Sequence, residues 1–213
     1  MEDYQYTRAL SGGWKRIVLF GLLAAIFGAG LSFVFPLRYS STMRLLIIQK
    51  QLSQSDPYTA MKASERLSDN LGQIIYTTSF FEKVLATQFN IDRTIFKTDE
   101  TKKRKQWDQM IATQVVSGSG MLVVTVYHTD PAQATQIARA IAFVLTTEGW
   151  QYVGGGDLQV KLVDQPLQSK YPVKPNIPAN AFAGFVLGLI AGAGQVLVVA
   201  SRHDLYETPA AIV

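Results

Sequence analysis

The sequence predicts an α+β domain that is anchored by two membrane-spanning helices. Uncharged apolar runs cover residues 17–37 and 179–200 of the 213-residue chain. Each run is long enough for a helix to cross a hydrocarbon core of about 30 Å. Between the two runs, strand-like alternation and helix-like periodicity follow one another, which predicts a mixed α+β domain. The expected division of the chain, in order, is 1–16 (N-terminal segment), 17–37 (first span), 38–171 (domain), 172–178 (proline-rich connector), 179–200 (second span) and 201–213 (tail).

Composition narrows the class of protein. Hydrophobic residues make up 48% of the chain, which suits one modest domain together with membrane segments. The chain has no cysteine, so a disulfide framework and a cysteine-ligated zinc site are excluded. The net charge of +4 is mild and does not by itself indicate a nucleic-acid partner.

The first apolar run has the flanks of a membrane anchor. Trp14, Lys15 and Arg16 directly precede it, as is typical of a membrane–water interface. A cleaved signal peptide is the alternative, but the run is too long and the bulky segment 35–38 offers no cleavage site. Residues 1–13 are polar and contain two adjacent glycines, so we expect no order there.

The second apolar run combines a proline connector with a glycine stripe. Three prolines at regular spacing predict a stiff, extended connector: Pro172, Pro175 and Pro178. Within the run, glycines recur every fourth residue and predict a face that lets another helix approach closely: Gly184, Gly188 and Gly192. Small residues of the first run are candidates to meet this face, although such residues are common in membrane helices: Ala24, Gly28 and Ala29.

The domain is expected to begin with a strand and two helices. Residues 39–48 are rich in β-branched and apolar side chains and predict a strand that directly follows the first span. A helix is predicted from Pro57 to about Ile75, with Asp56 as its N-cap. A second helix is predicted over residues 79–89.

One dense run of basic residues follows: Lys102, Lys103, Arg104 and Lys105. As a functional site, this run would contact an anion such as a lipid headgroup, a diphosphate or an acidic glycan. The alternative, which we favour, is the solvated face of a helix that continues through Trp107 and Met110 to Ile111.

A strand hairpin and a capped helix are expected next. Residues 114–127 read as a hairpin with its turn at 117–120. Asp130 is a natural N-cap with proline at the first helical position, and Gln133 has the spacing of a capping box. This helix should end near Gly149.

The last predicted strand covers residues 158–163, after a break at Gly154–Gly156. The first and last strands lead directly to the two spans. If the spans pair, these strands emerge close together, and we expect them to lie in one sheet.

No catalytic, cofactor or metal-binding motif is present in the sequence. There is no phosphate-binding loop motif, and His128 and His203, the only histidines, are predicted on opposite sides of the membrane. We therefore expect a non-enzymatic protein without a cofactor. Four aromatic residues are candidates to stack on sugar rings, with core packing as the favoured alternative: Trp107, Tyr127, Trp150 and Tyr152.

Three local patterns occur in an order that resembles a known family. They are the strand at 39–48, the strand and Asp-Pro helix start over 124–138, and the strand at 160–164 that leads to the proline-rich second span. Over most of residues 15–200 the chain resembles the Wzz-type chain-length determinants, also called polysaccharide co-polymerases.

The resemblance implies a bacterial inner (cytoplasmic) membrane protein with both termini in the cytoplasm, an orientation that the balanced Lys and Arg flanks leave open. It also implies a ring-like homo-oligomer that regulates the chain length of lipopolysaccharide O-antigen, capsule or exopolysaccharide. In such a ring, we expect the proline connector, the stripe of Gly184, Gly188 and Gly192 and the extramembrane sheet to hold the subunits together. The expected partners are a polysaccharide polymerase or exporter and a lipid-linked glycan. The short helix at 131–149 places the chain in the short class, whose members pair with a separate cytoplasmic tyrosine kinase in some capsule systems. Arg139 and Gln165–Pro166 depart from the family pattern and leave the subclass open.

A second class of function remains open from the residues alone. A two-span sensor, or an accessory subunit of a transporter or signalling complex, would have the same architecture. A neighbouring gene for a polymerase, flippase or tyrosine kinase would favour the chain-length regulator, whereas one for a histidine kinase or a transporter ATPase would favour the sensor.

Overall fold

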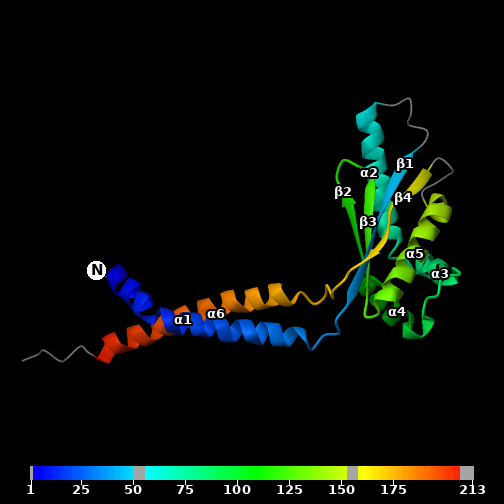
Figure 1. Ribbon diagram of the computed structural model, residues 1–213. Helices are drawn as coiled ribbons and strands as arrows, with labels where there is room; N and C mark the ends of the chain where they lie inside the picture. The colour runs from blue at the N-terminus through cyan, green and yellow to red at the C-terminus, as the bar shows by residue number, and fades with distance from the viewer. Residues whose placement is uncertain (1, 50–55, 153–157, 207–213) are drawn as a thin grey trace, which may run out of the picture. The chain divides into compact units, whose positions relative to one another are not determined.

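The computed structural model describes residues 2–49, 56–152 and 158–206, in two compact units (Figure 1). The α+β unit is Leu37–Val173, and the helix pair consists of Met1–Pro36 and Lys174–Val213. The predicted glycine break at 154–156, most of the loop before Asp56 and the end of the tail lie outside the described residues.

One four-stranded antiparallel sheet organises the α+β unit, in the order β2-β3-β1-β4 (Figure 1). The strands are β1 (Tyr39–Gln49), β2 (Ile111–Val116), β3 (Met121–His128) and β4 (Leu158–Gln168). β1 pairs with β3 from Tyr39 opposite His128, and on its other side with β4 from Ser41 opposite Gln168. The first and last strands of the unit are therefore neighbours in the sheet.

The helices of this unit pack on one face of the sheet. They are α2 (Pro57–Ile74), α3 (Thr78–Ala86), α4 (Glu100–Met110) and α5 (Pro131–Glu148). Strand residues that point toward them alternate along β1 and β3 and are at most 1% exposed: Met43, Leu45, Ile47, Leu122, Val124 and Val126. They form one core with the apolar stripe of α5, including Ile137, Ala138, Ile141 and Leu145. This alternation is the period of a sheet with one buried face.

An aromatic cluster fastens α4 to the core. Trp107 is 1% exposed, and its indole Nε1 donates to the Ile75 carbonyl oxygen at 2.7 Å. The ring of Phe81 lies edge-on to Trp107 and to Phe96, with ring centroids 4.8 and 4.9 Å apart. The hydrogen bond satisfies the polar end of a buried indole, as such side chains require. Trp107 is therefore a core residue, as the favoured alternative predicted.

The N-cap of α5 is confirmed, whereas the capping box is wrong. Asp130 Oδ1 accepts from the backbone N–H two residues later at 2.8 Å, but the Asp130 N–H donates to His128 Nδ1 at 2.9 Å. Gln133 turns instead to the preceding loop, where its Oε1 accepts from Asp92 N at 3.0 Å and its Nε2 donates to Asn90 O at 3.3 Å. A tertiary partner has replaced the local one.

Three boundaries differ from the sequence predictions. α3 ends at Ala86 rather than at residue 89, and Ile111 opens β2 instead of closing α4. β4 continues through Pro166 to Gln168, well beyond residue 163. Proline is compatible with β4 because an edge strand has an unpaired side, where a missing N–H costs no ladder bond.

In the helix pair, α1 (Glu2–Ser32) and α6 (Ile177–Tyr206) run antiparallel and side by side (Figure 1). Their segments Leu10–Ser32 and Ile177–Ser201 are long and apolar enough to cross a membrane. The expectation of no order over residues 1–13 is wrong, because the helix extends to Glu2. The first span also ends earlier than predicted, at Ser32.

Pro178 is not part of an extended connector, because α6 begins at Ile177 and places this proline in its first turn. The first-turn N–H groups have no intrahelical partner, so proline loses nothing there. Asn176 precedes the helix, and its Oδ1 accepts from Ala179 N at 3.1 Å. The connector is therefore shorter than the predicted 172–178.

Candidate functional site

The glycine stripe of α6 packs directly against α1 of the same chain. The stripe consists of Gly184, Gly188 and Gly192. A Cβ atom added at Gly188 would lie 2.7 Å from Ala24 Cβ and would also collide with the Phe20 carbonyl oxygen. At Gly192 it would lie 2.9 Å from Ile17 Cα, and at Gly184 it would collide with the Ala24 carbonyl. The backbones thus approach so closely that only glycine fits.

α1 contributes small residues of its own to this contact. Ala24 meets the stripe, and a Cβ at Gly28 would lie 2.6 Å from the Asn180 carbonyl oxygen. Gly21, which the sequence analysis did not single out, is buried under Leu189 and Phe185, each 2.9 Å from the place of its Cβ. Gly21 and Gly28 are two helical turns apart, and that spacing could have identified them.

A polar link joins the two helices near one end. Asn180 Nδ2 donates to Ser32 Oγ at 2.9 Å, and Ser32 Oγ donates to the Gly28 carbonyl at 3.2 Å. Ser32 is 2% exposed. Such hydrogen bonds stabilise helix pairs in an apolar solvent, on average by about 0.6 kcal/mol. No local sequence pattern predicts this link, because its two members are far apart in the chain.

The α+β unit closes where the chain enters and leaves it. Ser169 N donates to Ser40 O at 2.7 Å, and Val173 N donates to Arg38 O at 2.8 Å. The first bond extends the pairing of β1 with β4 by one residue beyond β4, and the second lies beyond the ends of both strands. The two ends of the unit, at Arg38 and Val173, therefore lie side by side.

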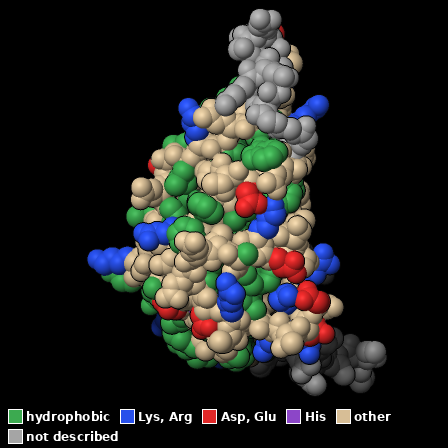
Figure 2. Space-filling view, turned by 90° about the vertical axis from the view of Figure 1, so that its right-hand side faces the viewer, with side chains coloured by type: hydrophobic (Ala, Val, Ile, Leu, Met, Phe, Trp, Pro, Cys, Tyr) green, Lys and Arg blue, Asp and Glu red, His purple; other side chains and the backbone are tan. Residues whose placement is uncertain are grey.

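The basic run of Lys102 to Lys105 lies on α4 and does not form a compact cationic cluster. Lys103 pairs with Glu100 at 2.5 Å and lies 5.7 Å from the centroid of the Phe81 ring, while the other three side chains are exposed. Arg104 and Lys105 line a surface hollow together with Asp108, whose single carboxylate offsets part of their charge. Figure 2 shows basic and acidic side chains interspersed on the visible face. The run lies on a helix, as the favoured alternative predicted, and contact with an anion or glycan stays a prediction.

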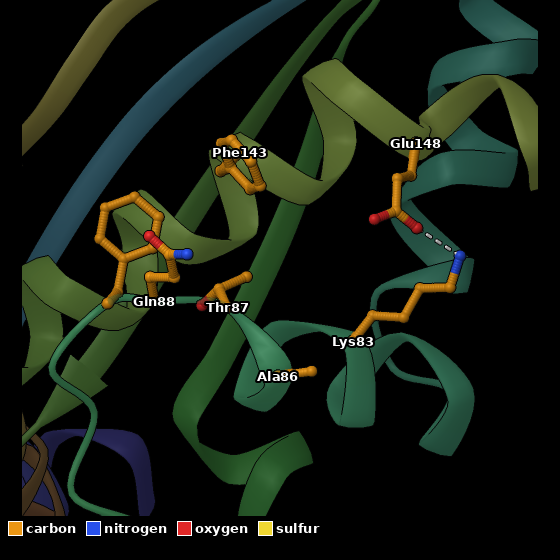
Figure 3. Close-up of a pocket in the computed structure, with 7 residues that line it drawn as sticks. Lys83, Ala86, Thr87, Gln88, Phe143 and Glu148 are labelled. Atoms are coloured by element: carbon orange, nitrogen blue, oxygen red, sulfur yellow. Dashed lines mark hydrogen bonds and ion pairs between the residues drawn. The ribbon is translucent and has the colours of Figure 1, made fainter.

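A cavity of about 550 Å³ lies between the end of α3 and α5 (Figure 3). It exists because α3 stops at Ala86. Thr87 takes extended geometry, with φ −66° and ψ 162°, and its Oγ1 donates to the Val84 carbonyl at 2.7 Å. The following residues then run beside α5. We call this cavity the α3–α5 groove; it is lined by Lys83, Ala86, Thr87, Gln88, Phe89, Phe143 and Glu148.

An ion pair occupies one side of the groove. Lys83 Nζ lies 2.5 Å from Glu148 Oε2, and it also donates to Gln151 Oε1 at 2.8 Å. The hydrogen bond that Lys83 donates to Glu148 is the largest cause that raises the pKa of Lys83 above its ordinary value of 10.5. Both side chains are about one-third exposed, at 33% and 37%. The pair is therefore accessible to solvent, and the opposite charges of its two members cancel.

Aromatic and amide side chains occupy the other side of the groove, as Figure 3 shows for Phe143 and Gln88. Phe143 is 49% exposed, although it is a large apolar residue of α5. Phe89 packs edge-to-face on it, with ring centroids 6.1 Å apart. This contact fixes the orientation of the exposed ring. The groove thus combines one exposed aromatic ring with polar groups whose charges sum to zero.

No side-chain cluster with the composition of a metal site occurs in the part of the chain that the structure describes. Of the aromatic residues considered for sugar stacking, Trp150 is 46% exposed, and its Nε1 donates to the Thr147 carbonyl at 3.0 Å. The exposed ring at the groove belongs to Phe143, which sequence reasoning missed. Only the packing of α3 on α5 brings Lys83 of α3 together with Phe143 and Glu148 of α5, so no sequence motif marks the site. Comparison with models of known protein families gives no match, and comparison with curated proteins gives no significant match.

Proposed function

We propose that this chain is a non-enzymatic membrane scaffold that regulates the chain length, polymerisation or export of a surface polysaccharide. The proposal rests on the resemblance to Wzz-type chain-length determinants and on the two apolar helices long enough to cross a membrane. Under this proposal both termini are cytoplasmic, and Leu37–Val173 lies outside the inner membrane.

One observation carries the proposal. In each unit, the two chain segments that connect it to the other unit are joined by a hydrogen bond. In the α+β unit, Arg38 is hydrogen-bonded to Val173. In the helix pair, Ser32 is hydrogen-bonded to Asn180. A single folded module whose two ends lead to a pair of membrane anchors is the arrangement that we expect of a scaffold.

The proposed scaffold acts as a ring-like homo-oligomer with a polysaccharide polymerase or exporter and its lipid-linked glycan. In the structure, α1 of the same chain already packs against the glycine stripe. Contacts between subunits therefore use other surfaces, and the stripe contributes indirectly by keeping the two anchors paired. A separate cytoplasmic tyrosine kinase is a further proposed partner of this class.

Deletion of the gene tests the proposal. Gel analysis of the surface polysaccharide should show a shifted or broadened length distribution, and the intact gene supplied in trans should restore the original one. An unaltered distribution in the deletion strain would remove the proposed function. A change in solute transport or in transcriptional signalling, with polysaccharide length intact, would instead favour the sensor or accessory subunit.

The orientation has a separate test. Alkaline phosphatase folds only outside the cytoplasm, so a fusion within the loop at Asp92 should be active and a fusion after Tyr206 inactive. The opposite pattern would place the α+β unit in the cytoplasm, where it could not act on a surface polysaccharide.

A further inference from the structure

The α3–α5 groove has the size and the mixed lining of a ligand site. Its volume of about 550 Å³ is within the range of roughly 300–1,000 Å³ that is typical of small-molecule pockets. The ring of Phe143 faces this space with about half of its surface exposed. Burial of that surface by a ligand would remove apolar area from water, which is favourable.

The polar groups of the groove retain unused hydrogen-bonding capacity. Lys83 has three ammonium protons; it donates to Glu148 and Gln151, and its Nζ also lies 5.0 Å from the centroid of the Tyr152 ring, so a ligand would compete for the third proton. Glu148 accepts through Oε2, and within the described residues no bond reaches its Oε1. The Gln88 amide likewise makes no hydrogen bond to the described part of the chain, and it is exposed. A ligand would thus meet donors and acceptors in close proximity.

These features select the chemistry of the ligand. The Lys83–Glu148 pair is neutral in sum, so neither an anion nor a cation is preferred. A purely apolar ligand would cover the Gln88 amide and the free Oε1 of Glu148 without offering them hydrogen bonds, which is costly. A sugar ring fits both sides, because its hydroxyl groups donate and accept while its C–H face can lie against an aromatic ring.

We propose that the α3–α5 groove binds a saccharide segment of the polymer, with Phe143 as the stacking platform and Gln88, Lys83 and Glu148 as the hydroxyl-binding groups. The choice of a saccharide over other neutral hydroxyl-bearing ligands rests on the proposed function. Bound there, the growing polymer is held by the scaffold itself, in addition to its polymerase or exporter.

The test uses the full-length chain in lipid nanodiscs and short oligosaccharides cut from the surface polysaccharide of the strain that encodes it. Titration calorimetry measures the dissociation constant for the wild type and for Phe143→Leu, Phe143→Trp and Gln88→Ala. Tyr58→Ala is the matched control, because Tyr58 is an aromatic residue of α2 that is 63% exposed and does not line the groove. Circular dichroism verifies that each variant is folded.

Leucine keeps an apolar side chain at position 143 but removes the ring, so binding should weaken by about 3-fold to 10-fold. Tryptophan keeps a stacking surface and should bind within about 2-fold of the wild type. Gln88→Ala should weaken binding by about 2-fold to 10-fold through loss of a hydrogen bond, and Tyr58→Ala should leave it unchanged. Saturable binding with this order of affinities supports the proposal.

Absence of saturable binding by the wild type, or equal affinities for the leucine and tryptophan variants, would overturn it. Displacement of the oligosaccharide by unrelated peptides would also overturn it, in favour of a peptide groove. The gene deletion separates this inference from the proposed function. If binding depends on Phe143 but the deletion leaves polymer length unaltered, the groove binds a saccharide and the proposed function is wrong. If the deletion alters polymer length but the protein binds no oligosaccharide, the proposed function holds and the groove proposal is wrong.

Discussion

Replacement of Gly188 by leucine should weaken the contact between α1 and α6. In the structure, even the first carbon of a side chain at this position would lie 2.7 Å from Ala24 Cβ and 2.8 Å from Gly21 Cα. Non-bonded carbon atoms prefer separations of about 3.5–4.0 Å, so the two backbones would have to move apart by roughly 1 Å. Three further carbons of leucine would follow into the same space.

The expected cost is moderate. Overpacking of a close contact destabilises by about 1–3 kcal/mol. Loss of a glycine from a helix interior returns about 0.5–1 kcal/mol. The helix pair should therefore lose about 0.5–2 kcal/mol, which corresponds to roughly a 2-fold to 30-fold shift in the equilibrium between paired and separated helices.

Disulfide formation between the two helices measures this shift. The chain has no cysteine of its own. A Cβ at Gly13 would lie 3.3 Å from Val196 Cβ, close to the separation of about 3.5–4.5 Å that disulfides require. In a Gly13→Cys, Val196→Cys background, the rate of cross-linking within one chain in membranes should fall when Gly188→Leu is added.

Gly194→Leu is the matched control, because a Cβ at Gly194 meets nothing within 4 Å. It adds the same side chain to the same helix and should leave the rate unchanged. Equal rates for the two leucine variants would refute the assignment of Gly188 to the helix contact. Cross-links that join two chains in place of one would instead assign the stripe to a contact between subunits.

Three further predictions concern single side chains. Asn180→Leu removes the hydrogen bond to Ser32 of α1 and should destabilise the helix pair by about 0.6 kcal/mol. An unfolding titration with dodecyl sulfate measures this loss, and a loss above about 2 kcal/mol would contradict the modest contribution expected of the bond. Trp107→Phe leaves the Ile75 carbonyl without its buried donor, so chemical denaturation should show a loss of about 1–3 kcal/mol, and an unchanged midpoint would refute that account. The pKa of Lys83 is raised in the folded state, chiefly by the hydrogen bond to Glu148. The contribution of Lys83 to folding stability is therefore complete below the unfolded pKa of about 10.4, and it is lost as the pH rises through the folded pKa. The stability difference between wild type and Lys83→Met should therefore be constant from about pH 7 to 9 and shrink above about pH 10.5, and a difference that changes near neutral pH would contradict this ion pair.

Elements whose signals are local could be predicted from the sequence. β1 alternates between apolar and polar residues, α2 and α5 each begin at a capping aspartate followed by proline, and the turn at 117–120 is rich in glycine. In each case the residues that determine the structure lie within a few positions of one another. The spacing of the stripe glycines in α6 likewise follows directly from the helical period.

Features that depend on distant partners could not be predicted. Gln133 has the spacing of a capping box, yet the loop at Asn90 and Asp92 offers better partners in space. The α3–α5 groove requires α3 to end at Ala86, and the helical periodicity gave no sign of this early end. Tertiary contacts decided both outcomes, and a single sequence carries no record of which segments will meet.

The pairing of β1 with β4 also determines how the α+β unit resists mechanical load. A sideways pull that drew Arg38 away from Val173 would load the hydrogen bonds between these strands one after another, beginning at the bond that joins these two residues. Strands that peel apart in sequence yield at far lower force than strands that must slide past one another. The unit therefore tolerates little separation of the two chain segments that lead to α1 and α6. Close packing of α1 against α6 limits that separation and so keeps β1 and β4 paired.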